Sequence, residues 1–179
     1  TIDIILKYDN LNLIFLNFTF NEETGFIPKA GLIKNSKDIA IEIFKKSYGS
    51  LIFISSCIYK RENLNKLSNH KLVNEITSPL LNSFFCCSKG DIFITGKPWV
   101  DFRTDNASYA GLKHNIQKIK FEGIIPILES LNDFGYSNYE IQQLTSSFMK
   151  NQIPSFILYF FINPWNAVKL FVYFLNFKK

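Results

Sequence analysis

Three short runs rich in leucine, isoleucine and phenylalanine lie between longer segments with helical spacing, and this alternation constrains the fold more than any other feature of the sequence. The runs cover residues 11–20, 50–60 and 91–103, and each has the length and composition of a β-strand. The third run contains the sequence 96–98 (Gly-Lys-Pro), which indicates an edge strand or a β-bulge. Strands that alternate with helices predict an α/β fold with a mixed sheet and flanking helices.

The segments between and after the three runs are predicted to be helical. A first helix is expected to end at Gly49, because glycine is the commonest residue just past a helix end. A second helix is predicted over residues 71–88, although Pro79 in its middle removes a backbone donor and threatens a kink. Further helices are expected after the third run, one of them opened by a capping box at residues 137–140.

The composition favours an ordered core and a basic surface. The chain is 47% hydrophobic, with 19 phenylalanines, so disorder is excluded as its main state. The net charge is +5 and the pI about 9.0. The lysines are scattered, whereas nucleic-acid-binding proteins usually cluster them, so we predict no nucleic-acid partner. A basic surface beside an aromatic segment suits an anionic membrane face.

The three cysteines do not form a disulfide framework, because their number is odd and two of them are adjacent. They are Cys57, Cys86 and Cys87. Neither histidine lies at a metal-ligand spacing from them. We interpret the three residues as buried or half-buried thiols and predict no metal site in this chain.

The segment 153–179 is strongly aromatic and carries one charge, Lys169, before two lysines at its end. A membrane-spanning helix needs about 20 apolar residues, and Asn163–Pro164 divides the segment into two shorter pieces. Aromatic residues with flanking lysines suit helices that lie in the headgroup region of a bilayer. We predict a membrane-surface segment, with packing against protein or a membrane span as the alternatives.

The segment GKPWVDFRTDNASYAG (residues 96–111) is the richest candidate for a site. Asp101, Arg103 and Asp105 alternate, so on a continuing strand they would share one face. A guanidinium keeps neighbouring acids ionised and offers a fork to a phosphate, and an exposed tryptophan can stack on a sugar or a base. The alternative is a strand end closed by a local Arg–Asp pair and an Asx turn. The candidate binding residues here are Trp99, Asp101, Arg103, Asp105 and Asn106.

Three stretches follow one another in an informative order: LNLIFLNFTF (11–20), GSLIFISSCIYKRENL (49–64) and GDIFITGKPWVDFRTDNASYAG (90–111). The first looks like a strand after an acidic metal-binding motif, the second like a strand that leads to an arginine, and the third like the strand and loop after an acceptor-side helix. In this order they resemble the C-terminal half of a family 2 glycosyltransferase of the GT-A type, as found in bacterial polysaccharide and lipopolysaccharide synthesis. The resemblance covers residues 1–115 and implies a partial GT-A, Rossmann-like domain.

The resemblance implies sugar transfer from a nucleotide-sugar donor to a polysaccharide, lipopolysaccharide or lipid-linked acceptor. The family uses a divalent metal, Mg²⁺ or Mn²⁺, held by an Asp-x-Asp motif, and an acceptor-side carboxylate as general base. This sequence has no Asp-x-Asp motif, since Asp3 and Asp9 stand alone. The resemblance therefore places the donor half and the metal ligands upstream of Thr1, and we expect this chain alone to be inactive.

The resemblance also implies roles for residues outside the 96–111 segment. Glu75 is the nearest acid on the predicted acceptor-side helix and is the candidate base, although the family's acidic pair at the start of that helix is not evident. Ser55 and Ser56 match positions at the acceptor cleft. Arg103 matches the family's arginine after the third strand, which implies a position near the diphosphate or the acceptor.

The resulting prediction divides the chain into an acceptor-side GT-A part (1–115), a helical extension (116–152) and an aromatic membrane-associating tail (153–179). The predicted location is the cytoplasmic face of the membrane, as a peripheral protein. The alternative function is a non-catalytic module at the membrane surface, whose α/β part binds a protein.

Overall fold

The computed structural model describes residues 2–8, 10–20, 23–24, 29–52, 56–73, 75–102 and 113–176. Its strands are β1 (Leu13–Phe20), β2 (Glu23–Thr24), β3 (Gly31–Ile33), β4 (Cys57–Tyr59) and β5 (Ile92–Phe102). Its helices are α1 (Ile2–Lys7), α2 (Lys37–Ile52), α3 (Arg61–Leu67), α4 (Ser78–Ser88), α5 (Lys113–Lys118), α6 (Ile125–Ser130), α7 (Asn138–Asn151), α8 (Ile153–Ile162) and α9 (Pro164–Asn176). A π-helix (η2, Ile119–Ile124) joins α5 to α6, and a 3₁₀-helix (η3, Leu131–Phe134) follows α6.

The described strands form one mixed sheet in the order β2–β1–β5–β3, and β4 also pairs with β1. The central strands β1 and β5 are parallel, with paired residues from Leu13↔Ile92 to Phe20↔Phe102. The pairs of β1 with β2 and β4, and of β5 with β3, are antiparallel. The predicted α/β fold with a mixed sheet and flanking helices is confirmed.

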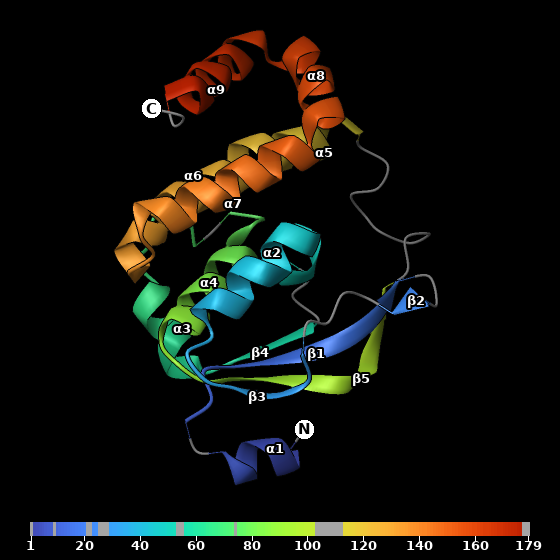
Figure 1. Cartoon of the computed structure of the whole chain (residues 1–179), viewed down its shortest axis with the longest axis vertical. Coiled ribbons are helices and arrows are strands. Elements are labelled where there is room, and N and C mark those ends of the chain that lie inside the picture. The colour runs from blue at the N-terminus through green and yellow to red at the C-terminus, as the bar shows by residue number, and fades with distance from the viewer. Residues whose placement is uncertain are drawn as a thin grey trace.

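The core lies between the sheet and the helices stacked above it, which form successive layers of α2 with α4 and then α6 with α7 (Figure 1). Alternate residues of the central strands, such as Phe15 of β1 and Ile94 of β5, are buried against the first helical layer. Aromatic rings join the layers: the ring centre of Phe44 lies 5.7 Å from that of Phe84 and 6.1 Å from that of Phe148. The many phenylalanines thus connect sheet and helices in one core.

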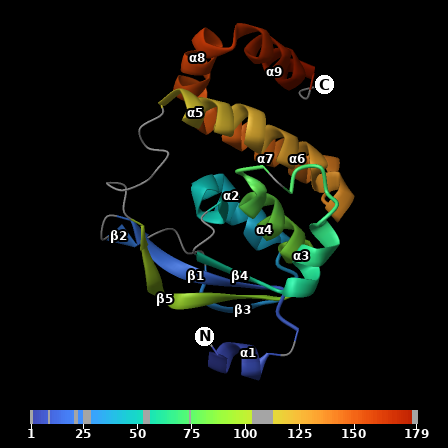
Figure 2. The same ribbon diagram turned by 180° about the vertical axis from the view of Figure 1, so that it is seen from behind.

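The opposite face of the sheet is crossed by α1, at the end of the molecule away from α8 and α9 (Figure 2). Tyr8, just after α1, lies with its ring centre 5.7 Å from that of Phe93 in β5. Ile14 of β1 pairs with Phe93 and with Ile58 of β4, so these three apolar residues form a row on this face.

Two helix boundaries differ from the predicted ones. Gly49 does not end the first helix: α2 continues to Ile52 through a kink at Ser47 (φ −155°, ψ 81°), and this shortens the following strand to β4. The second helix begins at Ser78, so the prediction that it covers residues 71–77 is wrong. Pro79 lies in its first turn, where the missing N–H has no intrahelical partner to lose.

The other helical predictions are confirmed with one addition. Residues 137–140 form a capping box, in which the N–H of Glu140 donates to the Ser137 hydroxyl over 3.2 Å and the Glu140 carboxylate accepts from the Ser137 N–H over 2.6 Å. The chain meets Pro126 with the π-helix η2 rather than with a sharp kink. Asn163 (φ −143°, ψ 76°) separates α8 from α9, as predicted.

Candidate functional site

The carboxyl ends of β1 and β5 lie at one edge of the sheet, because the two strands are parallel neighbours (Figure 1). Ligands of open α/β sheets bind at such edges. Trp99 in β5 is 60% exposed, and the backbone of Asp101 pairs with that of Thr19 in β1. The predicted site residues outside the described part of the chain are Ser55, Arg103, Asp105 and Asn106.

A β-bulge changes the course of β5 immediately before Trp99. Phe15 of β1 pairs with Ile94, but Asn17 pairs with Pro98, so residues 95–97 of β5 stand opposite a single residue of β1. The irregularity predicted around Pro98 is confirmed as a bulge. Bulges next to sites redirect the side chains that follow, and here those side chains are the ones the sequence singled out.

Asn17 and Thr95 hold this bulge together. The N–H of Asn17 donates to the Thr95 hydroxyl over 2.8 Å, and that hydroxyl donates to the carbonyl of Lys97 over 3.1 Å. The Asn17 side-chain oxygen accepts from the N–H of Phe18 over 2.7 Å. Asn17 and Thr95 are both buried, so these bonds are shielded from water. We interpret them as the residues that orient the candidate segment.

The start of α4 carries no carboxylate. Its N-cap residue Thr77 is buried beneath η2, and a Cβ added at Gly123 would lie only 2.8 Å from Cγ2 of Thr77. The extension therefore covers this helix end closely. Glu75 is exposed in the turn before α4, and its carbonyl accepts from the N–H of Ser78 over 2.9 Å. The predicted helical position of Glu75 is wrong, because α4 begins after it.

Ser56 is buried among polar groups that join β4 to α4. Its hydroxyl lies 3.8 Å from the sulfur of Cys57, which lies 3.9 Å from the hydroxyl of Ser83. The Tyr59 hydroxyl lies 3.1 Å from the same Ser83 oxygen. In this arrangement Ser56 packs beneath the surface and does not face solvent.

The thiols match the sequence interpretation. Cys86 and Cys87 are buried and Cys57 is partly buried, all three unoxidised. Burial raises the pKa of Cys57 and raises that of Cys86 to about 12. A thiol with a raised pKa is protonated at neutral pH and is a poor nucleophile. These cysteines therefore serve packing.

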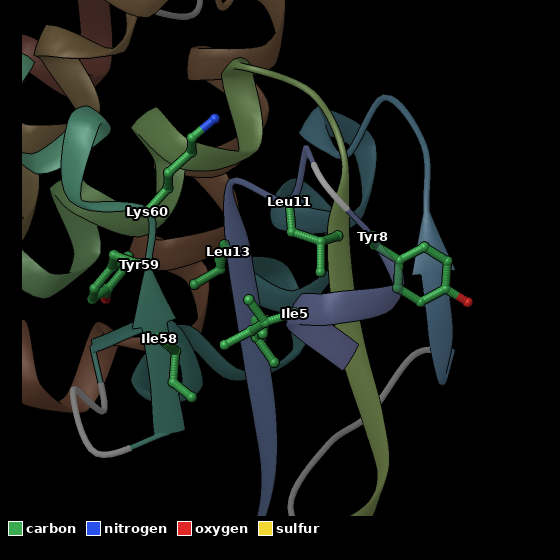
Figure 3. Close-up of a pocket in the computed structure, with 8 residues that line it drawn as sticks. Ile5, Tyr8, Leu11, Leu13, Ile58, Tyr59 and Lys60 are labelled. Carbon is green, nitrogen blue, oxygen red and sulfur yellow. The ribbon is translucent and has the colours of Figure 1, made fainter. Parts of the chain in front are cut away.

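A hollow of about 270 Å³ lies between α1 and the adjacent sheet face (Figure 3). Leu13, Ile58 and Ile5 gather around it, while the ammonium end of Lys60 points away from them. Lys60 lies 3.5 Å from the carboxylate of Glu62. The lining is mainly apolar and includes no predicted site residue, so the hollow offers no groups for catalysis.

A second surface is apolar and exposed. We name it the outer face of α8–α9, and it consists of Ile153, Ile157, Leu158, Phe160, Phe161, Trp165, Val168, Phe171 and Val172. The opposite sides of both helices pack inward, with the ring centre of Phe121 5.3 Å from that of Phe156 and 5.0 Å from that of Tyr159. The described part of the chain contains no helix long and apolar enough to cross a membrane.

No group of three or more histidine, cysteine, aspartate or glutamate side chains among the described residues is arranged to hold a metal ion. Comparison of the chain with protein-family models, with curated proteins and with solved structures finds no match. The function is therefore argued from the residues alone.

The structure brings Trp99 and the backbone of Asp101 to the sheet edge and leaves Glu75 on a separate exposed turn. Sequence reasoning missed Asn17 and Thr95. The available signal was a single asparagine inside an otherwise apolar strand.

Proposed function

We propose that this chain is the acceptor-side part of a family 2 glycosyltransferase with the GT-A fold, which transfers a sugar from a nucleotide-sugar donor to a polysaccharide, lipopolysaccharide or lipid-linked acceptor. The observation that carries the proposal is the parallel pair β1–β5, whose carboxyl ends share one edge. The segment 96–111 leaves the sheet there, and its sequence resembles the strand and loop that border the acceptor in this family. An exposed Trp99 suits stacking on a sugar ring.

In this proposal Glu75 takes the proton of the attacking acceptor hydroxyl, and Arg103 stabilises the leaving diphosphate or binds the acceptor. Asn17 and Thr95 keep the strand before Arg103 in its course. A divalent metal, Mg²⁺ or Mn²⁺, would add charge stabilisation of the diphosphate, with ligands from an Asp-x-Asp motif upstream of Thr1. In-frame coding sequence before Thr1 that ends a strand–helix segment with Asp-x-Asp would support this arrangement.

The two arginines of the chain provide a matched test. We expect Arg103→Ala, made in the protein expressed with its upstream sequence, to lower sugar transfer by roughly a hundredfold, as for loss of a group that stabilises transition-state charge. Arg61→Ala, at the start of α3, should leave transfer unchanged. Thermal unfolding of both variants checks the folded fraction. Normal turnover per folded Arg103→Ala molecule would contradict the proposed role and favour a purely structural strand end.

A second candidate, a non-catalytic module at the membrane surface, is favoured by the outer face of α8–α9. Both candidates share a peripheral position at the cytoplasmic face of a membrane. Removal of residues 153–179 should abolish sedimentation of the protein with anionic vesicles, since the exposed apolar side chains lie there. Undiminished sedimentation of the truncated protein would exclude the tail as the membrane contact. Sugar transfer by the longer protein would separate the enzyme from the module.

A further inference from the structure

The outer face of α8–α9 has a most exposed point at the elbow between the two helices. Phe161 is 79% exposed and Trp165 is 80% exposed, and both flank the break at Asn163. Large aromatic side chains at such exposure are costly in water and favourable in the headgroup region of a bilayer. Figure 1 shows this elbow at the end of the molecule farthest from the sheet.

The charges of the two helices fit an anionic lipid surface. Residues 153–176 contain no aspartate or glutamate. Their one charged side chain, Lys169, is exposed and lies one helical turn after Trp165 and one before Val172, so it belongs to the same side of α9. A lysine among exposed apolar residues reaches the phosphates while its stem stays in the interface.

The carboxylates that the elbow lacks lie beneath it. Glu122 of η2 accepts a hydrogen bond from the Tyr159 hydroxyl over 2.6 Å and one from the Asn163 side-chain amide over 3.0 Å. Asn166, in the first turn of α9, also donates to Glu122. One carboxylate therefore binds α8, the break and α9 together.

A second carboxylate binds the far part of the elbow. Glu129 lies seven residues after Glu122, on the same side of the helical run, and hydrogen-bonds to Tyr173 of α9. The inner sides of the helices add apolar packing, because Tyr159 and Ala167 are fully buried. The angle between α8 and α9 is thus fixed from the protein side.

Burial by itself would raise the pKa of the Glu122 carboxyl, but hydrogen bonds from Tyr159, Asn163 and Asn166, together with nearby Lys118, lower it overall. Glu122 is consequently ionised at neutral pH. An ionised carboxylate makes a charge-assisted hydrogen bond with each donor, which is stronger than a neutral one.

We propose that α8 and α9 form a preset wedge for an anionic lipid surface, in which Phe161 and Trp165 enter the bilayer interface while Glu122 and Glu129 hold the two helices through Tyr159 and Tyr173. This inference rests on the membrane-surface position in the proposed function. It names the inserting residues and the positioning residues, and it does not depend on catalysis.

The inserting residues are tested with vesicles of equal parts phosphatidylcholine and phosphatidylglycerol. Phe161→Ser with Trp165→Ser should weaken sedimentation on the order of tenfold or more, because two large apolar side chains no longer leave water. Ile76→Ser with Tyr139→Ser removes two similarly exposed apolar side chains outside the wedge and should leave binding unchanged. In a Trp99→Phe protein, the emission of Trp165 should shift to the blue and be quenched by brominated lipid.

The positioning residues are tested by Tyr159→Phe and Tyr173→Phe, which remove only the two hydroxyl groups. We expect several-fold weaker vesicle binding, faster amide exchange in α8 and α9, and a changed quenching depth of Trp165. Tyr136→Phe is the control: its hydroxyl donates to the carbonyl of Phe84 in the core, so its loss should lower global stability and leave vesicle binding unchanged.

The outcomes separate the inference from the proposed function. Wild-type protein that does not bind these vesicles would overturn both the membrane position and the wedge. Binding that is lost on removal of residues 153–179 but survives Phe161→Ser with Trp165→Ser would overturn the wedge alone. Unchanged binding and amide exchange in Tyr159→Phe and Tyr173→Phe would overturn the positioning role of the two glutamates.

Discussion

The α/β core and the α8–α9 elbow are built from the same residue types and use them in opposite ways. Phe84 on α4 is fully buried, whereas Phe161 on α8 is 79% exposed. In the core, every apolar side of a helix or strand meets another element, as the layers in Figure 1 show. The elbow packs inward on one side only. Apolar composition therefore predicts that a segment avoids water but not whether protein or lipid covers it.

The largest effect is expected in the core. Phe84→Ala should lower the free energy of unfolding by about 3–5 kcal/mol, because its ring is buried between Phe44, at 5.7 Å, and Tyr136, at 5.5 Å, and the deletion leaves a cavity. Urea denaturation measures the change. A loss close to zero would mean that the layers of α2, α4 and α7 do not share one core.

A smaller effect is expected at the β5 bulge. Thr95→Val should cost about 1–3 kcal/mol, because the buried N–H of Asn17 loses its acceptor. Thr95→Ser keeps the hydroxyl and should keep most of the stability. In the longer protein, Thr95→Val should also raise KM or lower kcat relative to Thr95→Ser. Equal stability and equal kinetics for the two variants would remove the orienting role of Thr95.

The capping box should contribute less and in a pH-dependent way. Burial alone would raise the pKa of Glu140, but hydrogen bonds from Ser137 and the charge of Lys37 lower it overall. The folded pKa thus lies below the ordinary value of 4.5, so the contribution is present above that pH and lost as the pH falls through the folded value. Ser137→Ala should cost about 1 kcal/mol. Unfolding curves at several pH values should show less acid sensitivity in Glu140→Gln.

The smallest effect on stability is expected at the elbow tip. Phe161→Ser should change the free energy of unfolding by less than about 0.5 kcal/mol, because an exposed side chain loses little on unfolding. The same variant should weaken vesicle binding, which reverses the order of effects seen at Phe84. A large loss of stability in Phe161→Ser would show that the tip packs on protein in solution.

Much of the fold could be predicted from local pattern. The strand at 11–20 and the break at Asn163 depend on composition and on proline, and both are found where predicted. The helix boundaries at Gly49 and Pro79 were wrong because each residue has two uses. Glycine is tolerated inside a helix that tertiary packing supports, and proline suits the first turn of a helix as well as its end.

The site was less predictable. The pair of Asn17 with Thr95 spans 78 residues of sequence, and the pair of Glu122 with Tyr159 spans 37. Single polar residues at such separations give no local signal, because only the completed fold brings them together. The bulge at Pro98 could be predicted since proline cannot donate to the ladder.

The most direct test of the proposed function measures sugar transfer itself. The protein with its upstream coding sequence is incubated with membranes, Mg²⁺ or Mn²⁺ and a set of radiolabelled nucleotide sugars, and the lipid and polysaccharide fractions are counted. The account predicts incorporation from one donor that needs the metal and is strongly reduced in Arg103→Ala but not in Arg61→Ala. No incorporation from any donor, in a protein that is folded and carries an Asp-x-Asp motif, would contradict it.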